Sequence, residues 1–273
     1  MEAHPDRVRN EREMEKTGMI DAADEEEMKR GESGVPEEGS GSGSRPASPG
    51  IDAAIFDMDG TLIDSMPVWH DAGARFLRKR GITPEEHLGD KLFTLNSASG
   101  AEYLIRNYHL PMDQNAVAKA LSEEMRDYYS SEADYRPGAK ELLDQFRSAG
   151  IPMVILTSTD GYLVEIALKR VGALDYFQHI YSSGDLKFSK GEPEIFRLVL
   201  SDLGTEAGRT AVFEDGLYAI RTANSEGFFT VGIREEISAG DQDAIERESD
   251  LYVRDLRQLS LNETEKTICI TKF

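Results

Sequence analysis

The sequence predicts an α/β protein built on a doubly wound parallel sheet, with a helical insertion and a disordered N-terminal tail. Three observations predict this arrangement. Short apolar runs of the length of buried parallel strands recur after residue 50. Most of them are separated by amphipathic helical patterns, as in right-handed βαβ units. One long interval, residues 66–136, has helical patterns but contains no strand candidate.

Residues 1–50 are expected to form a disordered acidic tail and linker. Between residues 31 and 50 the sequence, GESGVPEEGSGSGSRPASPG, consists mainly of Gly, Ser and Pro. Such a segment cannot bury enough apolar surface to offset the entropy that is lost on ordering. The sequence does not indicate what purpose the tail serves.

The predicted core, residues 51–65 and 137–273, alternates strands with helices. In the helix that begins near residue 192, Ile195, Val199 and Leu203 recur every four residues and form one apolar stripe. Strands that alternate with such helices form a Rossmann-like sheet that is covered on both faces. The strand candidates are residues 53–56, 152–156, 179–181, 210–213, 228–233 and 251–253, and the clearest helices are residues 137–150, 160–171 and 192–203.

The interval 66–136 is interpreted as a separate helical cap domain. It carries three amphipathic patterns, of which the first runs through Val68, Ala72 and Phe76. A crossover between parallel strands needs only one helix, so ordinary crossover helices explain the interval less well. We expect the two connections of this cap to the core to act as hinges.

Composition argues against several classes of partner. The formal charge of −20 disfavours binding to nucleic acid or to an anionic membrane, because both are polyanions. No apolar run approaches the roughly 20 residues that span a bilayer. Cys269 is the only cysteine, which excludes an intrachain disulfide and a thiolate metal cluster. We therefore expect a cytoplasmic protein with no nucleic-acid or membrane partner, and the oligomeric state is left open.

An acidic pair follows the first predicted strand. Asp57 and Asp59 come at the carboxyl end of an apolar strand, where the sites of open parallel sheets lie, and Gly60 lets the chain turn after them. Burying two neighbouring carboxylates is costly, because each loses hydration and the two charges repel each other. A divalent cation removes this conflict, and Mg²⁺ prefers such oxygen ligands. The alternative is a solvated acidic turn after a strand.

The surrounding sequence, FDMDGTLIDS at residues 56–65, resembles motif I of the haloacid dehalogenase-like superfamily, and specifically of its phosphotransferases. The resemblance extends from residue 51 to about residue 259. It implies that Asp57 is the nucleophile, which forms an aspartyl phosphate, and that Asp59 is the general acid and base. A carboxylate is a weak nucleophile, and Mg²⁺ would assist it by neutralising phosphoryl charge and aligning the attack.

Two later segments resemble the phosphate-binding motifs of that family. LTST at residues 156–159 resembles motif II, which implies a phosphate-binding hydroxyl at Thr157, with Ser158 as the rival. SKGEPEIF at residues 189–196 resembles motif III, although a Gly stands where the family has its first Pro. The resemblance implies that Lys190 neutralises charge that develops at the phosphate. A solvated surface lysine is the alternative.

A second acidic pair, in FEDG at residues 213–216, resembles motif IV, which completes the metal site. The resemblance implies that Asp215 binds the metal directly or through water, and that Glu214 is a direct or outer ligand. Together with Asp57 and Asp59 they form the expected Mg²⁺ site. The family often has Ser at the position of Gly216, a departure that leaves both carboxylates in place.

The resemblance implies a phosphatase that hydrolyses a phosphomonoester of a small metabolite. Dehalogenases of the superfamily need neither a second Asp nor a metal, so Asp59 and the pair at 214–215 argue against them. Sugar phosphomutases commonly have a His where this chain has Trp69. A β-phosphoglucomutase-like phosphomutase is nevertheless the alternative, and a non-catalytic regulatory or binding protein on the same fold is a second one.

The expected specificity segment of the cap, residues 93–99, contains no Lys or Arg. A neutral segment suits a substrate with one phosphate and a polar, uncharged remainder, such as a sugar or polyol phosphate. Asn96 and Ser97 are the candidate specificity residues within this segment.

Two further features are assigned no catalytic role. His70 follows Trp69 in the first predicted cap helix, and a surface or packing role explains it best. The aromatic residues Tyr128, Tyr129 and Tyr135 are interpreted as cap packing and as part of the hinge.

Overall fold

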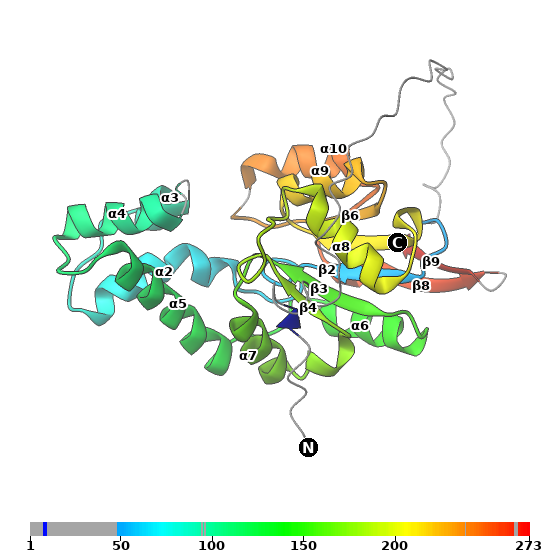
Figure 1. The fold of residues 1–273 in the computed structure, drawn as a ribbon, viewed down its shortest axis with the longest axis horizontal. Coiled ribbons are helices and arrows are strands. Elements are labelled where there is room, and N and C mark those ends of the chain that lie inside the picture. Colours follow the sequence, from blue (N-terminus) through cyan, green and yellow to red (C-terminus); the bar gives the residue numbers. More distant parts are fainter. Residues whose placement is uncertain (1–7, 10–47, 94, 96, 238, 265–266) are drawn as a thin grey trace, which may run out of the picture.

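A computed structural model describes residues 8–9, 48–93, 95, 97–237, 239–264 and 267–273. Its centre is a parallel sheet with the strand order β1-β4-β3-β2-β5-β6-β7 (Figure 1). From β2 in the middle of the sheet, the chain adds β3 and β4 on one side and β5, β6 and β7 on the other, so the predicted doubly wound α/β fold is confirmed. The strands are β1 (Val8–Arg9), β2 (Ala53–Phe56), β3 (Met153–Thr157), β4 (Ile180–Ser182), β5 (Thr210–Glu214), β6 (Phe229–Ile233) and β7 (Leu251–Val253).

Helices cover both faces of the sheet, which is why the central strands are apolar throughout rather than alternating. On one face α6 (Ala139–Ser148) and α7 (Gly161–Val171) pack against the side chains of Phe56, Ile155 and Phe213. On the other face α8 (Pro193–Leu203) and α9 (Leu217–Ser225) pack against those of Ile55, Val154 and Val212. The helix α10 (Gln242–Glu248) lies beside α9 (Figure 1).

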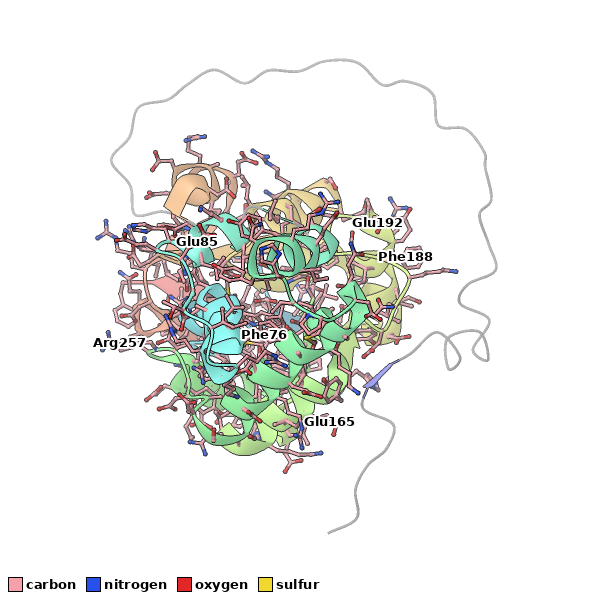
Figure 2. All side chains as sticks on the ribbon, turned by 90° about the vertical axis from the view of Figure 1, so that its left-hand side faces the viewer. Phe76, Glu85, Glu165, Phe188, Glu192 and Arg257 are labelled. Carbon is pink, nitrogen blue, oxygen red and sulfur yellow. The ribbon has the colours of Figure 1, made fainter. Side chains whose placement is uncertain are left out.

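Between β2 and β3 the chain makes a helical insertion that lies to one side of the sheet (Figure 1). It consists of α2 (Met66–Lys79), α3 (Leu88–Phe93), α4 (Ser97–Tyr108) and α5 (Gln114–Ser131). The short α3 is not expected from the sequence, because one turn and a half carries too few apolar positions to form a pattern. The insertion buries its own apolar cluster around Phe76, Leu104 and Val117. In Figure 2 it faces the viewer, with Phe76 inside it and the exposed Glu85 at its margin.

The two connections between the insertion and the sheet lie side by side. Ile63 and Tyr135 form an antiparallel bridge, the amide of Asp64 donates to the carbonyl of Asp134 at 3.1 Å, and that of Arg136 donates to the carbonyl of Leu62 at 2.8 Å. These bonds hold the start and the end of the insertion together, and Ile63 is also bridged to Asp59 in the loop after β2.

Both ends of the core differ from the sequence expectation. After β7 the chain forms an antiparallel hairpin of β8 (Leu259–Thr264) and β9 (Thr267–Lys272), which the sequence does not predict. Ser48, placed in the tail by the sequence, is buried against this hairpin and exchanges hydrogen bonds with Ile270. Val8 and Arg9, also assigned to the disordered tail, pair with β4 as strand β1. Backbone hydrogen bonds hold these segments, so composition alone does not reveal them. Residues 1–7 and 10–47 lie outside the described residues.

Candidate active site

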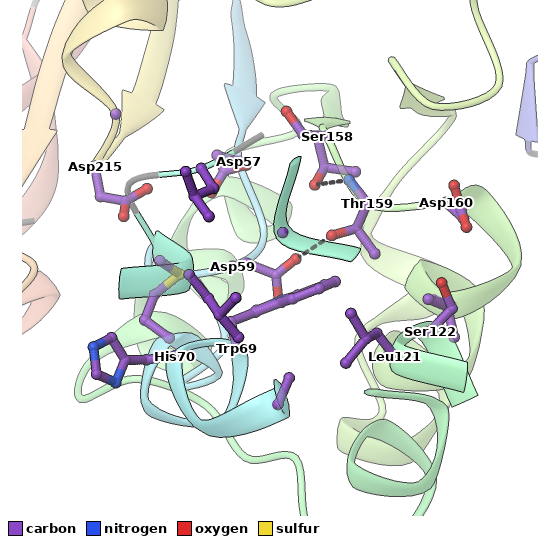
Figure 3. A pocket seen from close by; sticks show the side chains of 18 of the residues that line it. Asp57, Asp59, Trp69, His70, Leu121, Ser122, Ser158, Thr159, Asp160 and Asp215 are labelled. Atoms are coloured by element: carbon purple, nitrogen blue, oxygen red, sulfur yellow. Dashed lines mark hydrogen bonds between the residues drawn. The ribbon is translucent and has the colours of Figure 1, made fainter. Parts of the chain in front are cut away.

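A cavity of about 690 Å³ opens between the carboxyl ends of the strands and the helical insertion (Figure 3). The core side of its wall holds the predicted nucleophile, acid, phosphate-binding and metal-binding side chains. The side formed by the insertion is mostly apolar and includes Trp69, Leu104 and Leu121. The predicted residues on the wall are Asp57, Asp59, Thr157, Ser158, Lys190, Glu214 and Asp215. The parallel sheet therefore brings together residues that lie far apart in the sequence, as expected for the carboxyl edge of such a sheet.

The loop after β2 is shaped so that two acidic segments can approach each other. The amide of Asp57, the first residue after β2, still donates to the carbonyl of Phe213 in β5, at 3.0 Å, so the side chain is held at the end of the strand. Gly60 then adopts a φ of +83°, and a Cβ at this position would clash with Oδ2 of Asp215. Only glycine allows both the left-handed backbone and this close approach.

Three carboxylates and one ammonium form the base of the cavity. Oxygen atoms of Asp57, Glu214 and Asp215 lie within 4.8 Å of one another, and all three residues are buried. The Lys190 Nζ donates to Oδ1 of Asp57 at 2.7 Å and also to Glu214. Oδ2 of Asp57 is buried and has no hydrogen-bond partner among the described residues. A single ammonium cannot balance three ionised carboxylates, so the cluster carries an excess of negative charge whenever all three are deprotonated.

The pKa values follow from this crowding. Burial, reinforced by Glu214 and Asp59 and opposed by Lys190, raises the pKa of Asp57 to about 7. Burial, together with Asp57 and Glu214, holds the pKa of Asp215 well above its usual range. Although burial opposes it, the attraction of Asp57 and Glu214 raises the pKa of Lys190, so the ammonium stays charged.

These residues fit a divalent cation. Asp57, Glu214 and Asp215 form a group of hard oxygen ligands, which is the donor set that Mg²⁺ prefers, and Oδ2 of Asp57 has no hydrogen-bond partner among the described residues. Of the four expected metal ligands, Asp57, Glu214 and Asp215 come together, whereas the Asp59 side chain is not part of this group.

The Asp59 carboxylate is instead bound by hydroxyl groups. Its Oδ1 accepts hydrogen bonds from Oγ of Ser65 and from Oη of Tyr129, both at 2.5 Å. Its Oδ2 accepts from Oγ1 of Thr159 at 2.7 Å, a bond drawn in Figure 3. Burial, together with the Asp59 charge, raises the pKa of Tyr129 well above its usual range, so this phenol is a hydrogen-bond donor. Asp59 thus contacts the loop that follows β3 and the helical insertion.

The two candidate phosphate-binding hydroxyls differ in their surroundings. Thr157 is the last residue of β3 and is buried, and its Oγ1 accepts from the amide of Thr159 at 3.2 Å. Ser158 is exposed, with Oγ 3.3 Å from Oη of Tyr218. Both line the cavity, so they remain rival candidates.

The expected specificity residues cannot be placed as side chains. Asn96 lies outside the described residues, and Ser97 begins α4, but its side chain is not described. Leu92, directly before this segment, and Leu95, within it, line the cavity.

Sequence reasoning misses three residues that contact Asp59, namely Ser65, Tyr129 and Thr159. The sequence pattern assigns Tyr129 to packing, yet its phenol reaches Asp59 across 70 positions of sequence, a separation at which no local spacing links two residues. Thr159 directly follows the two candidate hydroxyls, and its position in LTST is the one available signal. His70 also lines the cavity, but its ring is 2.9 Å from the Asp90 carboxylate, in line with the packing role expected for it.

Comparison with known proteins agrees with this arrangement. Residues 51–227 match the family of haloacid dehalogenase-like hydrolases. The chain is 28% identical to a phosphorylated carbohydrates phosphatase of Thermotoga maritima, over 65% of this chain and 82% of the relative. It is 26% identical to the fructose-1-phosphate phosphatase YqaB of Escherichia coli, over 66% and 95%. A crystal structure of a Thermotoga maritima protein described as a candidate β-phosphoglucomutase superposes with a TM-score of 0.68 at 26% identity, covering 76% of this chain and 96% of that one.

The match over most of the core, together with the acidic cluster at the carboxyl edge of the sheet, establishes that the chain belongs to the haloacid dehalogenase-like hydrolase family. Within that family it is an enzyme of the phosphatase type. No helix in the described part of the chain is long and apolar enough to cross a membrane.

Proposed function

We propose that this protein is a Mg²⁺-dependent phosphomonoester hydrolase that acts on a small phosphorylated sugar or polyol through an aspartyl phosphate at Asp57. The observation that carries the proposal is the buried Asp57, which lies in the acidic cluster. Its Oδ1 is bound by Lys190, while its Oδ2 has no hydrogen-bond partner among the described residues. A buried carboxylate that has an oxygen free of hydrogen bonds can bind a cation and act as a nucleophile.

In the first step, an oxygen of Asp57 attacks the phosphorus. The bond between phosphorus and Asp57 forms while the bond to the leaving oxygen breaks, and Asp59, carrying a proton at this stage, gives that proton to the leaving oxygen. Lys190, which touches Asp57, attracts the negative charge of the phosphoryl group. A hydroxyl of Thr157 or Ser158 donates to a phosphoryl oxygen.

In the second step, Asp59 accepts a proton from a water molecule whose oxygen attacks the phosphorus. The bond between phosphorus and the Asp57 oxygen breaks, inorganic phosphate leaves, and both carboxyl groups return to their initial states. The side chains of Asp57, Glu214 and Asp215 would hold the Mg²⁺. When bound, the cation withdraws charge from the phosphoryl group and helps to orient it.

The cavity supports a substrate with a single phosphate. Lys190 is the only Lys or Arg among the described residues of its wall, and two carboxylates already engage this ammonium. A second phosphate would find no cation there. The volume suits a small metabolite, and the apolar faces of Trp69, Leu104 and Leu121 can pack against the C–H face of a sugar ring. Two of the relatives described above act on phosphorylated sugars, as their names state.

The proposal is tested by phosphate release from a panel of phosphomonoesters, measured with Mg²⁺ and with a chelator. We expect hydrolysis that stops on chelation and returns with Mg²⁺. The substitution Asp57→Asn keeps the shape of the side chain. It should lower turnover by at least roughly 10³-fold, because the amide is not a nucleophile.

The matched control is Asp64→Asn, an exposed carboxylate of the same segment that does not line the cavity. It should leave turnover within about twofold of the wild type. Undiminished hydrolysis by the Asp57→Asn variant would contradict the proposed nucleophile. Interconversion of hexose 1- and 6-phosphates that is faster than phosphate release would instead favour a phosphomutase, the class suggested by the Thermotoga maritima structure.

A further inference from the structure

The proposed mechanism assigns no role to the hydroxyl groups that bind Asp59. Its carboxylate receives hydrogen bonds from three parts of the chain, and the donor on the helical insertion is Tyr129 of α5. This phenol is fully buried, and it does not line the cavity among the described residues. It therefore has no evident role in binding a substrate.

The direction of the hydrogen bond between Tyr129 and Asp59 is set by a third residue. The Nε1 of Trp69 in α2 lies 3.0 Å from Oη of Tyr129. An indole N–H can only donate, so the phenol oxygen accepts this bond and keeps its own proton for Oδ1 of Asp59. Two helices of the insertion thus supply a chain of donors, from Trp69 to Tyr129 to Asp59. In Figure 3 the Trp69 side chain lies close to Asp59.

The arrangement also constrains how the Asp59 carboxyl group can rotate. Tyr129 and Ser65 share Oδ1, while Thr159 binds Oδ2 on the opposite side. Because a buried aromatic side chain has few alternative rotamers, the phenol is a more rigid donor than either of the small hydroxyl side chains. Loss of the phenol would leave Oδ1 with Ser65 alone among these donors.

We propose that Tyr129 is a positioning residue for the general acid: held by Trp69, it sets the orientation in which Asp59 reaches the leaving oxygen. This inference rests on the proposed function, in which Asp59 protonates that oxygen. It makes the helical insertion a supplier of part of the catalytic geometry, beyond its contribution to the cavity wall.

The test compares two substrates that differ in their need for an acid. The leaving group of p-nitrophenyl phosphate departs without protonation, whereas that of an alkyl phosphate such as glycerol phosphate requires it. The measured quantity is kcat/KM, which covers the steps up to release of the leaving group. For Tyr129→Phe we expect kcat/KM to fall about tenfold on the alkyl phosphate and less than about twofold on p-nitrophenyl phosphate.

Tyr128→Phe is the matched control. This neighbouring tyrosine of α5 is also buried, and its Oη donates to the backbone carbonyl of Asp64 at 2.7 Å, away from Asp59. It should leave the ratio of the two kcat/KM values unchanged. A second variant, Trp69→Phe, keeps an aromatic ring on the cavity wall and removes the donor to Tyr129, and it should shift the ratio in the same direction as Tyr129→Phe.

The outcomes separate this inference from the proposed function. The positioning role is wrong if Tyr129→Phe and Trp69→Phe both leave the ratio of the two kcat/KM values as in the wild type. Equal losses of kcat/KM on both substrates leave the ratio unchanged and count as this outcome, even if Asp57→Asn is inactive. If Asp57→Asn still releases phosphate, the proposed function itself fails. Should Tyr129→Phe not fold, the ratio for Trp69→Phe decides the matter.

Discussion

At the scale of single residues, the site depends on a glycine as much as on its charged groups. Gly60 has a left-handed backbone, and its missing Cβ makes room for the Asp215 carboxylate. The motif that contains it therefore combines a nucleophile with the turn that brings a carboxylate from β5 into reach. Substitution here should disturb Asp215 as well as the backbone.

We expect Gly60→Ala to lower the free energy of unfolding by about 1–2 kcal/mol from left-handed strain alone, and more from the clash with Asp215. It should also raise the Mg²⁺ concentration that gives half-maximal activity, because the carboxylate must move. Denaturant titration and a Mg²⁺ titration of phosphate release measure the two effects.

Gly150→Ala is the control for that prediction. Gly150 also has a left-handed φ, of +71°, but a Cβ there would meet no described atom within 4 Å. Gly150→Ala should lower the free energy of unfolding by a similar amount, about 1–2 kcal/mol, because of left-handed strain. It should leave the Mg²⁺ concentration for half-maximal activity unchanged. Equal Mg²⁺ requirements in the two variants would show that the Gly60 contact does not position Asp215.

At the scale of secondary-structure elements, Arg136 ties the return connection of the insertion to two loops of the core. Its guanidinium donates to the carbonyl of Gly60, to the carbonyl of Arg234 at 2.6 Å and to Oε2 of Glu235 at 2.5 Å. The side chains of Arg136 and Glu235 are only 13% and 6% exposed. Breaking such a pair leaves a buried charge without its partner, which is far more costly than losing a surface ion pair.

Arg136→Met should therefore lower the free energy of unfolding by about 3–5 kcal/mol, as measured by denaturant titration. The double variant Arg136→Met, Glu235→Gln should recover part of this loss, since the unpaired charge is then gone. Arg221→Met, which removes an ion pair with Glu248 on the surface of α9, is the control and should cost less than about 1 kcal/mol. A loss as small for Arg136→Met as for Arg221→Met would contradict this account of the buried ion pair.

The elements also show how much of the fold and the site can be predicted from the sequence. β2 and β5 are short apolar runs, and residues directly after or at the end of such runs meet at one edge of a parallel sheet. This rule places Asp57, Glu214 and Asp215 at the same edge, and the resemblance to the family's motifs implies that they share one site; the structure brings them together. Periodicity likewise identifies the long helices, such as α8, because each keeps one apolar face over several turns.

The features that the sequence does not predict depend on contacts between distant segments. Tyr129 lies in an apolar stripe of α5, where packing and hydrogen bonding to Asp59 leave the same pattern in the sequence. The hairpin of β8 and β9 and the pairing of Ser48 with Ile270 are held largely by backbone bonds, which have no side-chain signature. The short α3 carries too few residues for a periodic pattern to be recognised.

At the scale of the whole molecule, the buried acidic cluster should make stability depend on pH and on Mg²⁺ together. The pKa of Asp57 rises from 3.8 to about 7 on folding, chiefly because of burial. Between these values the folded, metal-free protein binds more protons than the unfolded chain, so its stability falls as pH rises from about 4 to about 7. Mg²⁺ binds the deprotonated carboxylates, and it should therefore compensate for this loss at the upper end of that range.

We expect saturating Mg²⁺ to raise Tm little at about pH 5.5 and clearly more at about pH 8, because at the lower pH protons compete for Asp57 and Asp215. Thermal unfolding at both pH values, with Mg²⁺ and with chelator, measures the effect.

The net charge of −20 also attracts Mg²⁺ without specificity. Asp57→Asn separates the two contributions, since it removes an ionising ligand and hardly changes the total charge, so its Mg²⁺-induced rise in Tm should be smaller and less dependent on pH. If the Mg²⁺-induced rise in Tm of the wild type is the same at both pH values, the cation does not bind at this cluster. The same conclusion follows if the wild type and Asp57→Asn show equal rises in Tm.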